Sequence, residues 1–269
     1  IKEVNIYQNG KLVRIDDDFD SRRAERKVSK TYNLDLVNGE NNFKVVALNF
    51  QNIESRPEIL NFEYTGEAVA TADLYILTIG INEYKNPKYN LNYAQADAIS
   101  FSQKLKQRSG KIFKSIKTYE IYDENGIKEN IINYLNTISA LSKPEDVFVL
   151  YYAGHGSIAE SPEGIEEYFL VPHDVTQIYG NYDLLKEKGI SSNELKEALT
   201  QIKPQKQLIL LDACHSGKAV SSFSTRAAAS EEKAIFQLAR SAGVVLIAAS
   251  GTEQFATEFE VLKHGGFTY

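Results

Sequence analysis

The chain has 269 residues, 43% of them hydrophobic, a formal net charge of −6 at pH 7 and a single cysteine. This length allows one large domain or two small ones with a proper core. No apolar run approaches the roughly 18–20 residues that span a bilayer, and there is no basic cluster, so neither a membrane nor a nucleic acid is an expected partner. One cysteine cannot form an internal disulfide, which favours a reducing, cytoplasmic setting.

Residues 1–68 predict a small β domain. Alternating apolar and polar residues flank the pair Asn9-Gly10, which is typical of a two-residue hairpin turn, and the pattern repeats around Asn38-Gly39. Four or five short strands with such turns indicate an all-β, sandwich-like domain. The charged residues 16–26 are expected to form a solvated loop.

Residues 73–269 predict an α/β domain, which we expect to continue beyond Tyr269. Strands and helices alternate along this part of the chain, which predicts a doubly wound, mostly parallel sheet with flanking helices. The expected strands span residues 74–82, 116–122, 146–154, 206–213 and 244–250, and the expected helices span residues 93–107, 127–139, 191–202 and 231–243.

Two segments bring reactive side chains to strand ends. The segment "FVLYYAGHGS" carries His155 between two glycines, and "LILLDACHSG" carries Cys214. In open α/β sheets, sites form where the carboxyl ends of the strands meet the loops. A cysteine nucleophile needs a base that makes its thiolate available, and His155 can supply that base. The pattern therefore favours nucleophilic catalysis by a Cys/His pair.

Interpretations of the cysteine other than a nucleophile stay open. A lone cysteine is most often a small buried hydrophobe, although the polar flanks of Cys214 are poor core residues. A zinc site is a second alternative, but its candidate ligands His155, His173, Cys214 and His215 lack the close paired spacing of such sites. A redox role would need a second thiol. We therefore expect no metal, and we expect His215 and His264 to be ordinary surface or loop residues.

The two segments resemble the signature blocks of the caspase-like cysteine peptidases, the clan of caspases, metacaspases and paracaspases. "YYAGHG" is similar to the histidine block and "DACHSG" to the cysteine block, with the histidine 59 residues upstream (214 − 155). "AASGTEQFATE" followed by "HGGFTY" resembles the start of the small subunit of the family. The resemblance covers residues 74–269, and "YKNP" and "YAQAD" are similar to a bacterial branch in which other modules often precede the peptidase domain.

The resemblance implies a mechanism. Cys214 would be the nucleophile and His155 the general acid and base, and the backbone N–H groups of Gly156 and Cys214 would form the oxyanion hole. The implied substrates are proteins or peptides. Two alternatives stay open: a catalytically silent caspase-like scaffold or regulatory module, and a hydrolase of small amides or thioesters with the same chemistry.

One position departs from the caspases that cut after Asp. They carry Gln two residues before the cysteine, whereas this chain has Asp212, and an acid there repels Asp and attracts Arg or Lys. Metacaspase-like enzymes pair such an acid with another from the first helix, and Asp97 stands at the matching place. We therefore expect a cysteine endopeptidase that cleaves after Arg or Lys.

The segment after the cysteine block predicts how the protein is activated. The polar residues 218–234 follow the cysteine block and contain Lys218 and Arg226, which are the expected processing sites of a zymogen. A regulatory protein or further domains of the same chain are the alternative activators. No cofactor is expected. Calcium stays open because residues 160–175 are acidic, but they are mostly glutamates and do not have the spacing of a recognisable site.

Overall fold

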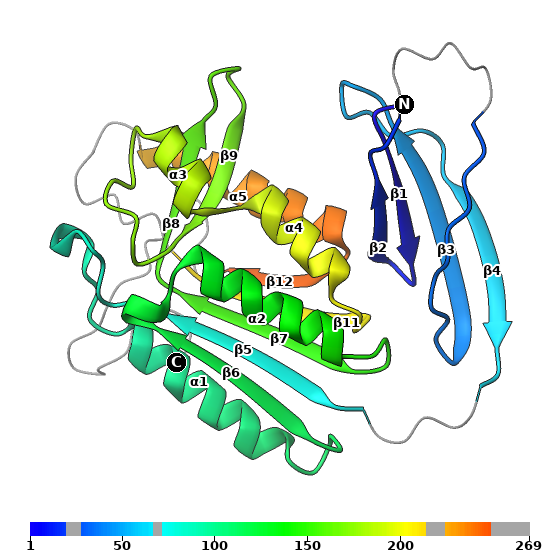
Figure 1. The fold of residues 1–269 in the computed structure, drawn as a ribbon, viewed down its shortest axis with the longest axis horizontal. Helices are drawn as coiled ribbons and strands as arrows, with labels where there is room; N and C mark the ends of the chain where they lie inside the picture. The colour runs from blue at the N-terminus through cyan, green and yellow to red at the C-terminus, as the bar shows by residue number, and fades with distance from the viewer. Residues whose placement is uncertain (20–27, 67–71, 214–223, 249–269) are drawn as a thin grey trace.

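The computed structural model describes residues 1–19, 28–66, 72–213 and 224–248, without the side chains of residues 224–232. These residues form three sheets, namely a four-stranded antiparallel sheet, a five-stranded parallel sheet and a three-stranded antiparallel sheet. Figure 1 shows the four-stranded sheet of the N-terminal residues on one side and the other two sheets, with all the helices, on the other.

The five-stranded sheet is the core of the molecule. Its order is β12-β11-β7-β5-β6, and every pair is parallel. All seven residues of β5 and six of the seven in β7 are buried, as expected of strands covered on both faces. The strands are β5 (Leu74–Gly80), β6 (Ile116–Tyr122), β7 (Val147–Ala153), β11 (Lys206–Asp212) and β12 (Val245–Ala248).

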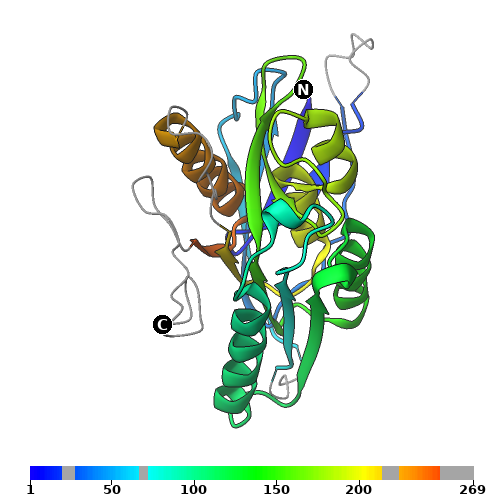
Figure 2. The same ribbon diagram turned by 90° about the vertical axis from the view of Figure 1, so that its left-hand side faces the viewer.

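Helices cover both faces of this sheet, so the predicted doubly wound architecture is confirmed. The first face packs against buried side chains of α2 (Lys128–Leu141), α4 (Ser192–Gln201) and α5 (Ser224–Ala242), and the second packs against α1 (Ala94–Ser109). Figure 2 shows α1 and α2 on opposite sides of the strands. No helix in the described parts of the chain is long and apolar enough to cross a membrane.

A small antiparallel sheet was missed at the level of sequence. It consists of β8 (His155–Glu160), β9 (Glu166–Val171) and β10 (Ile190–Ser191). The short helix α3 (Tyr182–Lys188) lies between β9 and β10 in the chain. The acidic residues 160–175 are therefore not simply a loop. Their glutamates gather around the turn between β8 and β9, whereas residues 168–171 of β9 are almost fully buried.

The β domain contains one sheet of order β2-β1-β3-β4 among the described residues. The Asn9-Gly10 hairpin is confirmed, because both residues have the positive φ angles (51° and 89°) that such a turn needs. The strand expected before Asn38 does not form, since Asn41 instead bonds through its side chain to the backbone of Val37. The strands are β1 (Glu3–Gln8), β2 (Lys11–Asp16), β3 (Gly39–Leu48) and β4 (Glu58–Tyr64).

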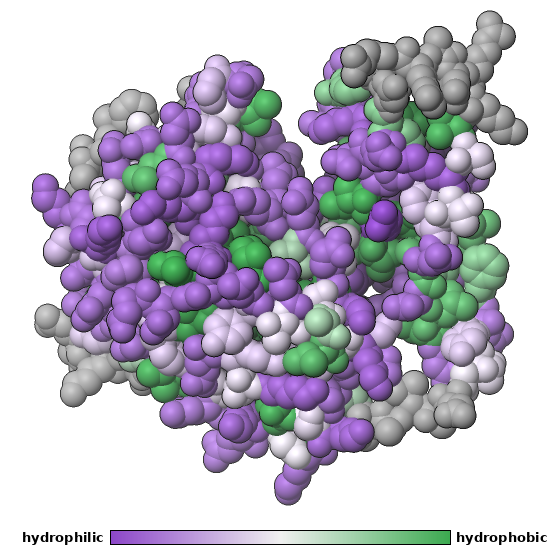
Figure 3. All heavy atoms as spheres, in the orientation of Figure 1, coloured by the Kyte–Doolittle hydropathy of each residue, from purple (hydrophilic) through white to green (hydrophobic). Residues whose placement is uncertain are grey.

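The outermost strand of this sheet, β4, is exposed along its whole length. It carries several large apolar side chains that are about half exposed, and Figure 3 shows apolar residues gathered where Figure 1 draws β3 and β4. The exposed apolar residues of β4 are Ile59, Leu60, Phe62 and Tyr64. Apolar surface gathered in this way is typical of a covered face.

The turn between β1 and β2 contacts the α/β domain at the amino ends of β11 and β12. Asn9 donates its side-chain amide to Gln205 (3.0 Å), just before β11, and Lys11 donates to the Thr200 carbonyl (3.5 Å) in the last turn of α4. Gly243 ends α5 with a φ of +66°, and a Cβ there would lie 1.9 Å from the Gly10 carbonyl oxygen. Only glycine therefore allows the turn to approach so closely.

The buried ammonium group of Lys11 predicts a pH-dependent stability. Burial lowers the pKa of Lys11 from 10.5 to about 8, so burying the charged form costs free energy below that pH. The unfolded chain then binds more protons than the folded chain between the two values, and stability rises with pH across that range. Compared with a Lys11→Met variant, the wild type should gain at most about 3 kcal/mol of unfolding free energy from pH 7 to pH 10. Urea unfolding of both proteins at several pH values measures this, and parallel curves would contradict it.

Candidate active site

The carboxyl ends of β7 and β11 lie side by side. Their ladder runs in register up to the pair Ala153↔Asp212, and the Gly154 N–H then donates to the Asp212 carbonyl at 3.2 Å. His155 follows at the start of β8. Cys214 lies outside the described residues, but it comes two positions after Asp212 in the sequence. The backbone thus brings the chain that leads into the cysteine beside the chain that leads into the histidine.

The His155 ring is buried and its orientation is fixed. Only 3% of the residue is exposed, and Nε2 lies 2.7 Å from the backbone carbonyl of Tyr89. A carbonyl oxygen only accepts hydrogen bonds, so Nε2 must carry a proton, and in the neutral ring Nδ1 is the acceptor. The Tyr84 ring packs against the imidazole with centroids 4.8 Å apart. This arrangement suits a base that works through Nδ1.

Local sequence places the Tyr89 carbonyl. Asn86 and Pro87 start a short 3-10 helix, η1 (Pro87–Tyr89), and the Asn86 side chain accepts a hydrogen bond from the backbone of Lys88. The Lys85 N–H also donates to the His173 carbonyl (2.8 Å), which ties this segment to the end of β9. Asn-Pro is a turn signal that sequence reasoning could have used, but its contact with His155 is tertiary.

Buried tyrosine hydroxyls hold the backbone on either side of the ring. The His155 N–H donates to the Tyr84 hydroxyl, and the Tyr152 hydroxyl donates to the His155 carbonyl, both at 2.9 Å. Burial raises the pKa of both tyrosines above the ordinary value, so both stay protonated.

Buried tyrosine hydroxyls also explain the two glycines that flank His155. A Cβ on Gly154 would lie 2.9 Å from the hydroxyls of Tyr84 and Tyr152, and a Cβ on Gly156 would lie 2.4 Å from that of Tyr168. Glycines beside a reactive residue let a substrate backbone approach. The described packing gives a second reason, which is that the tyrosines leave no room for a side chain.

Two carboxylates converge on Tyr151, on the face of the sheet that α1 covers. Asp212 has the same side-chain direction as Leu210 because residues alternate along β11, and Asp97 lies in the first turn of α1. The Tyr151 hydroxyl donates to Asp212 Oδ2 at 3.1 Å. Burial raises the pKa of Tyr151, and the charges of Asp212 and Asp97 raise it further. The two acids singled out in the sequence are thus near the same buried hydroxyl.

The remaining candidates are apart from this cluster or are not described. Lys218, His215 and His264 lie outside the described residues, as Cys214 does. Arg226 is the third residue of α5, so cleavage after it needs that helical turn to unwind. His173 Nδ1 contacts the Glu83 carbonyl at 2.5 Å, and within the described ranges no group of three potential metal ligands occurs.

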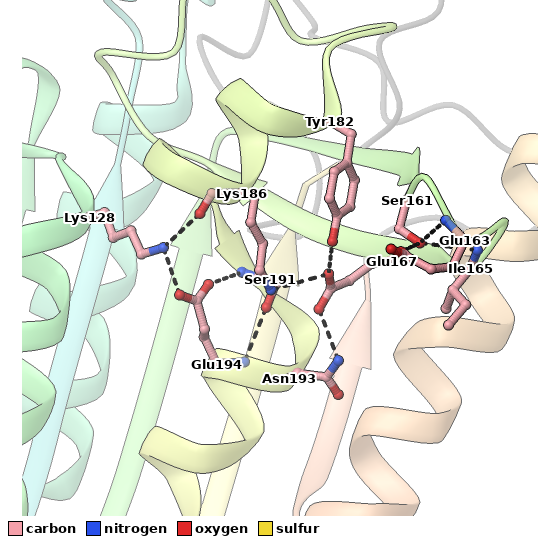
Figure 4. Close-up of polar contacts among 10 residues, drawn as sticks. All are labelled: Lys128, Ser161, Glu163, Ile165, Glu167, Tyr182, Lys186, Ser191, Asn193 and Glu194. Carbon is pink, nitrogen blue, oxygen red and sulfur yellow. Dashed lines mark hydrogen bonds and ion pairs between the residues drawn. The ribbon is translucent and has the colours of Figure 1, made fainter. Parts of the chain in front are cut away.

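A polar network anchors the small sheet that starts at His155. Glu167 of β9 accepts from the Asn193 amide (2.9 Å) and the Tyr182 hydroxyl (3.4 Å), and Lys186 is 3.6 Å away (Figure 4). The capping box of Ser191 and Glu194 starts α4 beside it. These contacts tie β9 to α3 and α4, and they engage the Glu167 carboxylate of the acidic segment 160–175.

Comparison with known proteins agrees with this geometry. The family model of the caspase domain matches residues 74–269. The structure of protein GSU0716 from Geobacter sulfurreducens is similar, with a TM-score of 0.50 and 17% identity over 73% of this chain and 79% of that chain. At this identity the likeness shows the fold alone. No curated protein sequence matches the chain.

Two further structures match weakly. They are the putative polysaccharide deacetylase BA0330 from Bacillus anthracis and the polysaccharide deacetylase BC0361 from Bacillus cereus, with TM-scores of 0.25 and 0.24 and identities of 14% and 16%. The matched regions cover 91% and 92% of this chain and 70% and 72% of those two chains, respectively. Scores this low carry no argument about the fold.

The family match covers well over half of the chain, so the chain belongs to the caspase-domain family. The resemblance noted in the histidine and cysteine blocks is thereby confirmed, as is the caspase-like α/β fold. Membership supports a cysteine peptidase type of function and protein substrates.

The tyrosine packing around Gly156 predicts a large effect of a small change. In Gly156→Ala the new methyl group meets the Tyr168 hydroxyl and ring, both buried, so the chain should lose about 1–3 kcal/mol of stability. Gly110→Ala is the matched control, because a Cβ there would meet only the Lys106 carbonyl at 3.7 Å. Thermal unfolding compares the two. Equal melting temperatures would show that the site tolerates a side chain.

Proposed function

We propose that this protein is a cysteine endopeptidase that cleaves after Arg or Lys through the pair Cys214 and His155. The observation that carries the proposal is the His155 ring, which is held at the end of the β7–β11 ladder with Nε2 on the Tyr89 carbonyl. The Tyr89 carbonyl fixes the tautomer and the orientation of the His155 ring, and a fixed tautomer suits a base that transfers protons through Nδ1.

The steps follow from this tautomer. The Cys214 thiol gives its proton to His155 Nδ1, and the thiolate attacks the carbonyl carbon of the scissile peptide bond. The backbone N–H groups of Gly156 and Cys214 hold the oxyanion. His155 then returns the proton to the leaving amine as the C–N bond breaks. A water molecule, deprotonated by His155, hydrolyses the thioester and releases the thiol and the acid. No step needs a metal, so we propose that the protein uses no cofactor. Calcium binding is the alternative.

The two carboxylates define the proposed specificity. The charges of Asp97 and Asp212 both act on one buried tyrosine hydroxyl, so a guanidinium or ammonium group bound beside it would meet the negative charge of both acids. A planar guanidinium can pair with a carboxylate through two hydrogen bonds, whereas an ammonium group acts as a point charge. We therefore propose that Arg is preferred to Lys and that Asp is rejected.

We also propose regulation by cleavage in the segment after Cys214, at Lys218 or Arg226, or by a partner protein. Lys218 is the better candidate, because Arg226 lies within α5 and a peptidase needs an extended backbone. A cytoplasmic location and a bacterial origin belong to the same proposal.

The first variants test catalysis. Cys214→Ala should abolish hydrolysis of an Arg-containing fluorogenic peptide, and His155→Ala should lower kcat/KM on the order of 10³-fold or more, since both proton transfers are lost. His173→Ala is the control, because this loop histidine lies on the Glu83 carbonyl and not at the end of β7. Turnover that survives in Cys214→Ala would rule out the proposed nucleophile. A wild type that hydrolyses none of the peptides would leave the silent scaffold as the better account.

Specificity is tested with matched peptides that differ only in the residue before the cut. The wild type should cleave the Arg peptide fastest, the Lys peptide more slowly and the Asp peptide not at all, because like charges in a desolvated cleft repel strongly. Asp97→Asn and Asp212→Asn should each lower kcat/KM for Arg on the order of 100-fold. Asp183→Asn, an exposed acid on α3, should change nothing. A wild type that prefers Asp would show that the acids are not the specificity pocket.

A further inference from the structure

Tyr151 is a buried polar residue that the proposed chemistry does not use. It lies on β7, four positions before His155, and its side chain is fully buried on the face that α1 covers. The Phe101 ring of α1 stacks on it with centroids 4.6 Å apart and an angle of 14° between the rings. Stacking and burial fix the ring, so the position of its hydroxyl is fixed as well.

That hydroxyl has one proton, and the proton is directed at Asp212. The distance from the Tyr151 oxygen to Asp212 Oδ2 is 3.1 Å. The Tyr151 ring is held by packing, and Asp212 is the last residue of β11. A hydrogen bond from a buried hydroxyl favours the ionised form of a carboxylate and sets its direction. Asp97 is near enough for its charge to act on the same hydroxyl.

Tyr151 is a neutral donor, so it bonds Asp212 without occupying the place of the ligand cation. A lysine or arginine in the position of Tyr151 would neutralise the charge that selects the substrate. Tyrosine is therefore suited to a pocket that must stay anionic and dry.

We propose that Tyr151 is a positioning residue for substrate selection, and that its hydroxyl holds the Asp212 carboxylate in the direction that a guanidinium group needs. The inference rests on the proposed function, since it concerns the same two acids. It adds a third member to them, on the strand that also leads to His155. Arg depends on carboxylate direction more than Lys does, because only Arg pairs through two parallel hydrogen bonds.

Tyr151→Phe keeps the ring and removes the hydroxyl. We expect KM for the Arg peptide to rise about tenfold while kcat stays near the wild-type value, and the Arg-to-Lys preference to fall about fivefold, because one charge-assisted hydrogen bond is worth about that much. Loss of packing alone would lower kcat and leave the Arg-to-Lys ratio unchanged. Tyr122→Phe is the matched control, since it removes another hydroxyl from the α1 side of the sheet, where Tyr122 packs against the same apolar cluster.

A binding measurement separates this inference from the proposed function. In the Cys214→Ala background, calorimetry with uncleaved Arg and Lys peptides should show the same loss of Arg preference in Tyr151→Phe. If the wild type prefers Arg and Tyr151→Phe keeps the full preference, the role of Tyr151 is wrong and the pocket stands. If the parent protein shows no preference for basic peptides, the pocket itself is wrong. A melting temperature near that of the wild type confirms that the variant is folded.

Discussion

The parallel ladder between β7 and β11 is the constraint on which the candidate site depends. Seven residue pairs hold the two strands in register up to Ala153↔Asp212, and the Gly154 N–H extends the contact by one more hydrogen bond. Both strands lie inside the sheet, with β5 and β12 as their outer neighbours. The approach of the histidine segment to the cysteine segment is thus fixed by backbone geometry and by burial on two faces. It does not depend on the chemistry of either side chain.

Alternation along β7 separates the contacts of the proposed catalytic histidine from those of the proposed specificity residues. Tyr152 points to the face of α2 and α4, where its hydroxyl holds the carbonyl of His155, whereas Tyr151 points to the face of α1, where its hydroxyl meets Asp212. A shift of register by one residue would exchange these roles and destroy both contacts. Adjacent tyrosines in β7 can therefore support the two proposed functions, because their side chains point in opposite directions. The β domain contacts the other end of β11, near Gln205, far along the strand from the site.

Much of this architecture could be predicted from the sequence, for identifiable physical reasons. The alternation of strand and helix patterns predicted the five central strands and the helices α1, α2, α4 and α5. The resemblance to the family predicted that Asp97 and Asp212 share a pocket, and the charges of both act on the Tyr151 hydroxyl. The β8–β9 hairpin was missed, because glutamates near its turn outweighed the short apolar run at residues 168–171. The Tyr89 carbonyl and the Tyr151 hydroxyl were missed because their partners are distant in sequence, so only tertiary packing reveals them.

We propose that Cys214, His155 and the two carboxylates form one site for a basic residue. A crystal structure of the chain after reaction with a peptidyl-arginine chloromethyl ketone, which traps the nucleophile, tests this. We expect a thioether on Cys214 Sγ, the inhibitor beside His155, and the guanidinium group within hydrogen-bonding distance of both Asp97 and Asp212. An adduct on any other residue, or a guanidinium group that points away from the two acids, would contradict it.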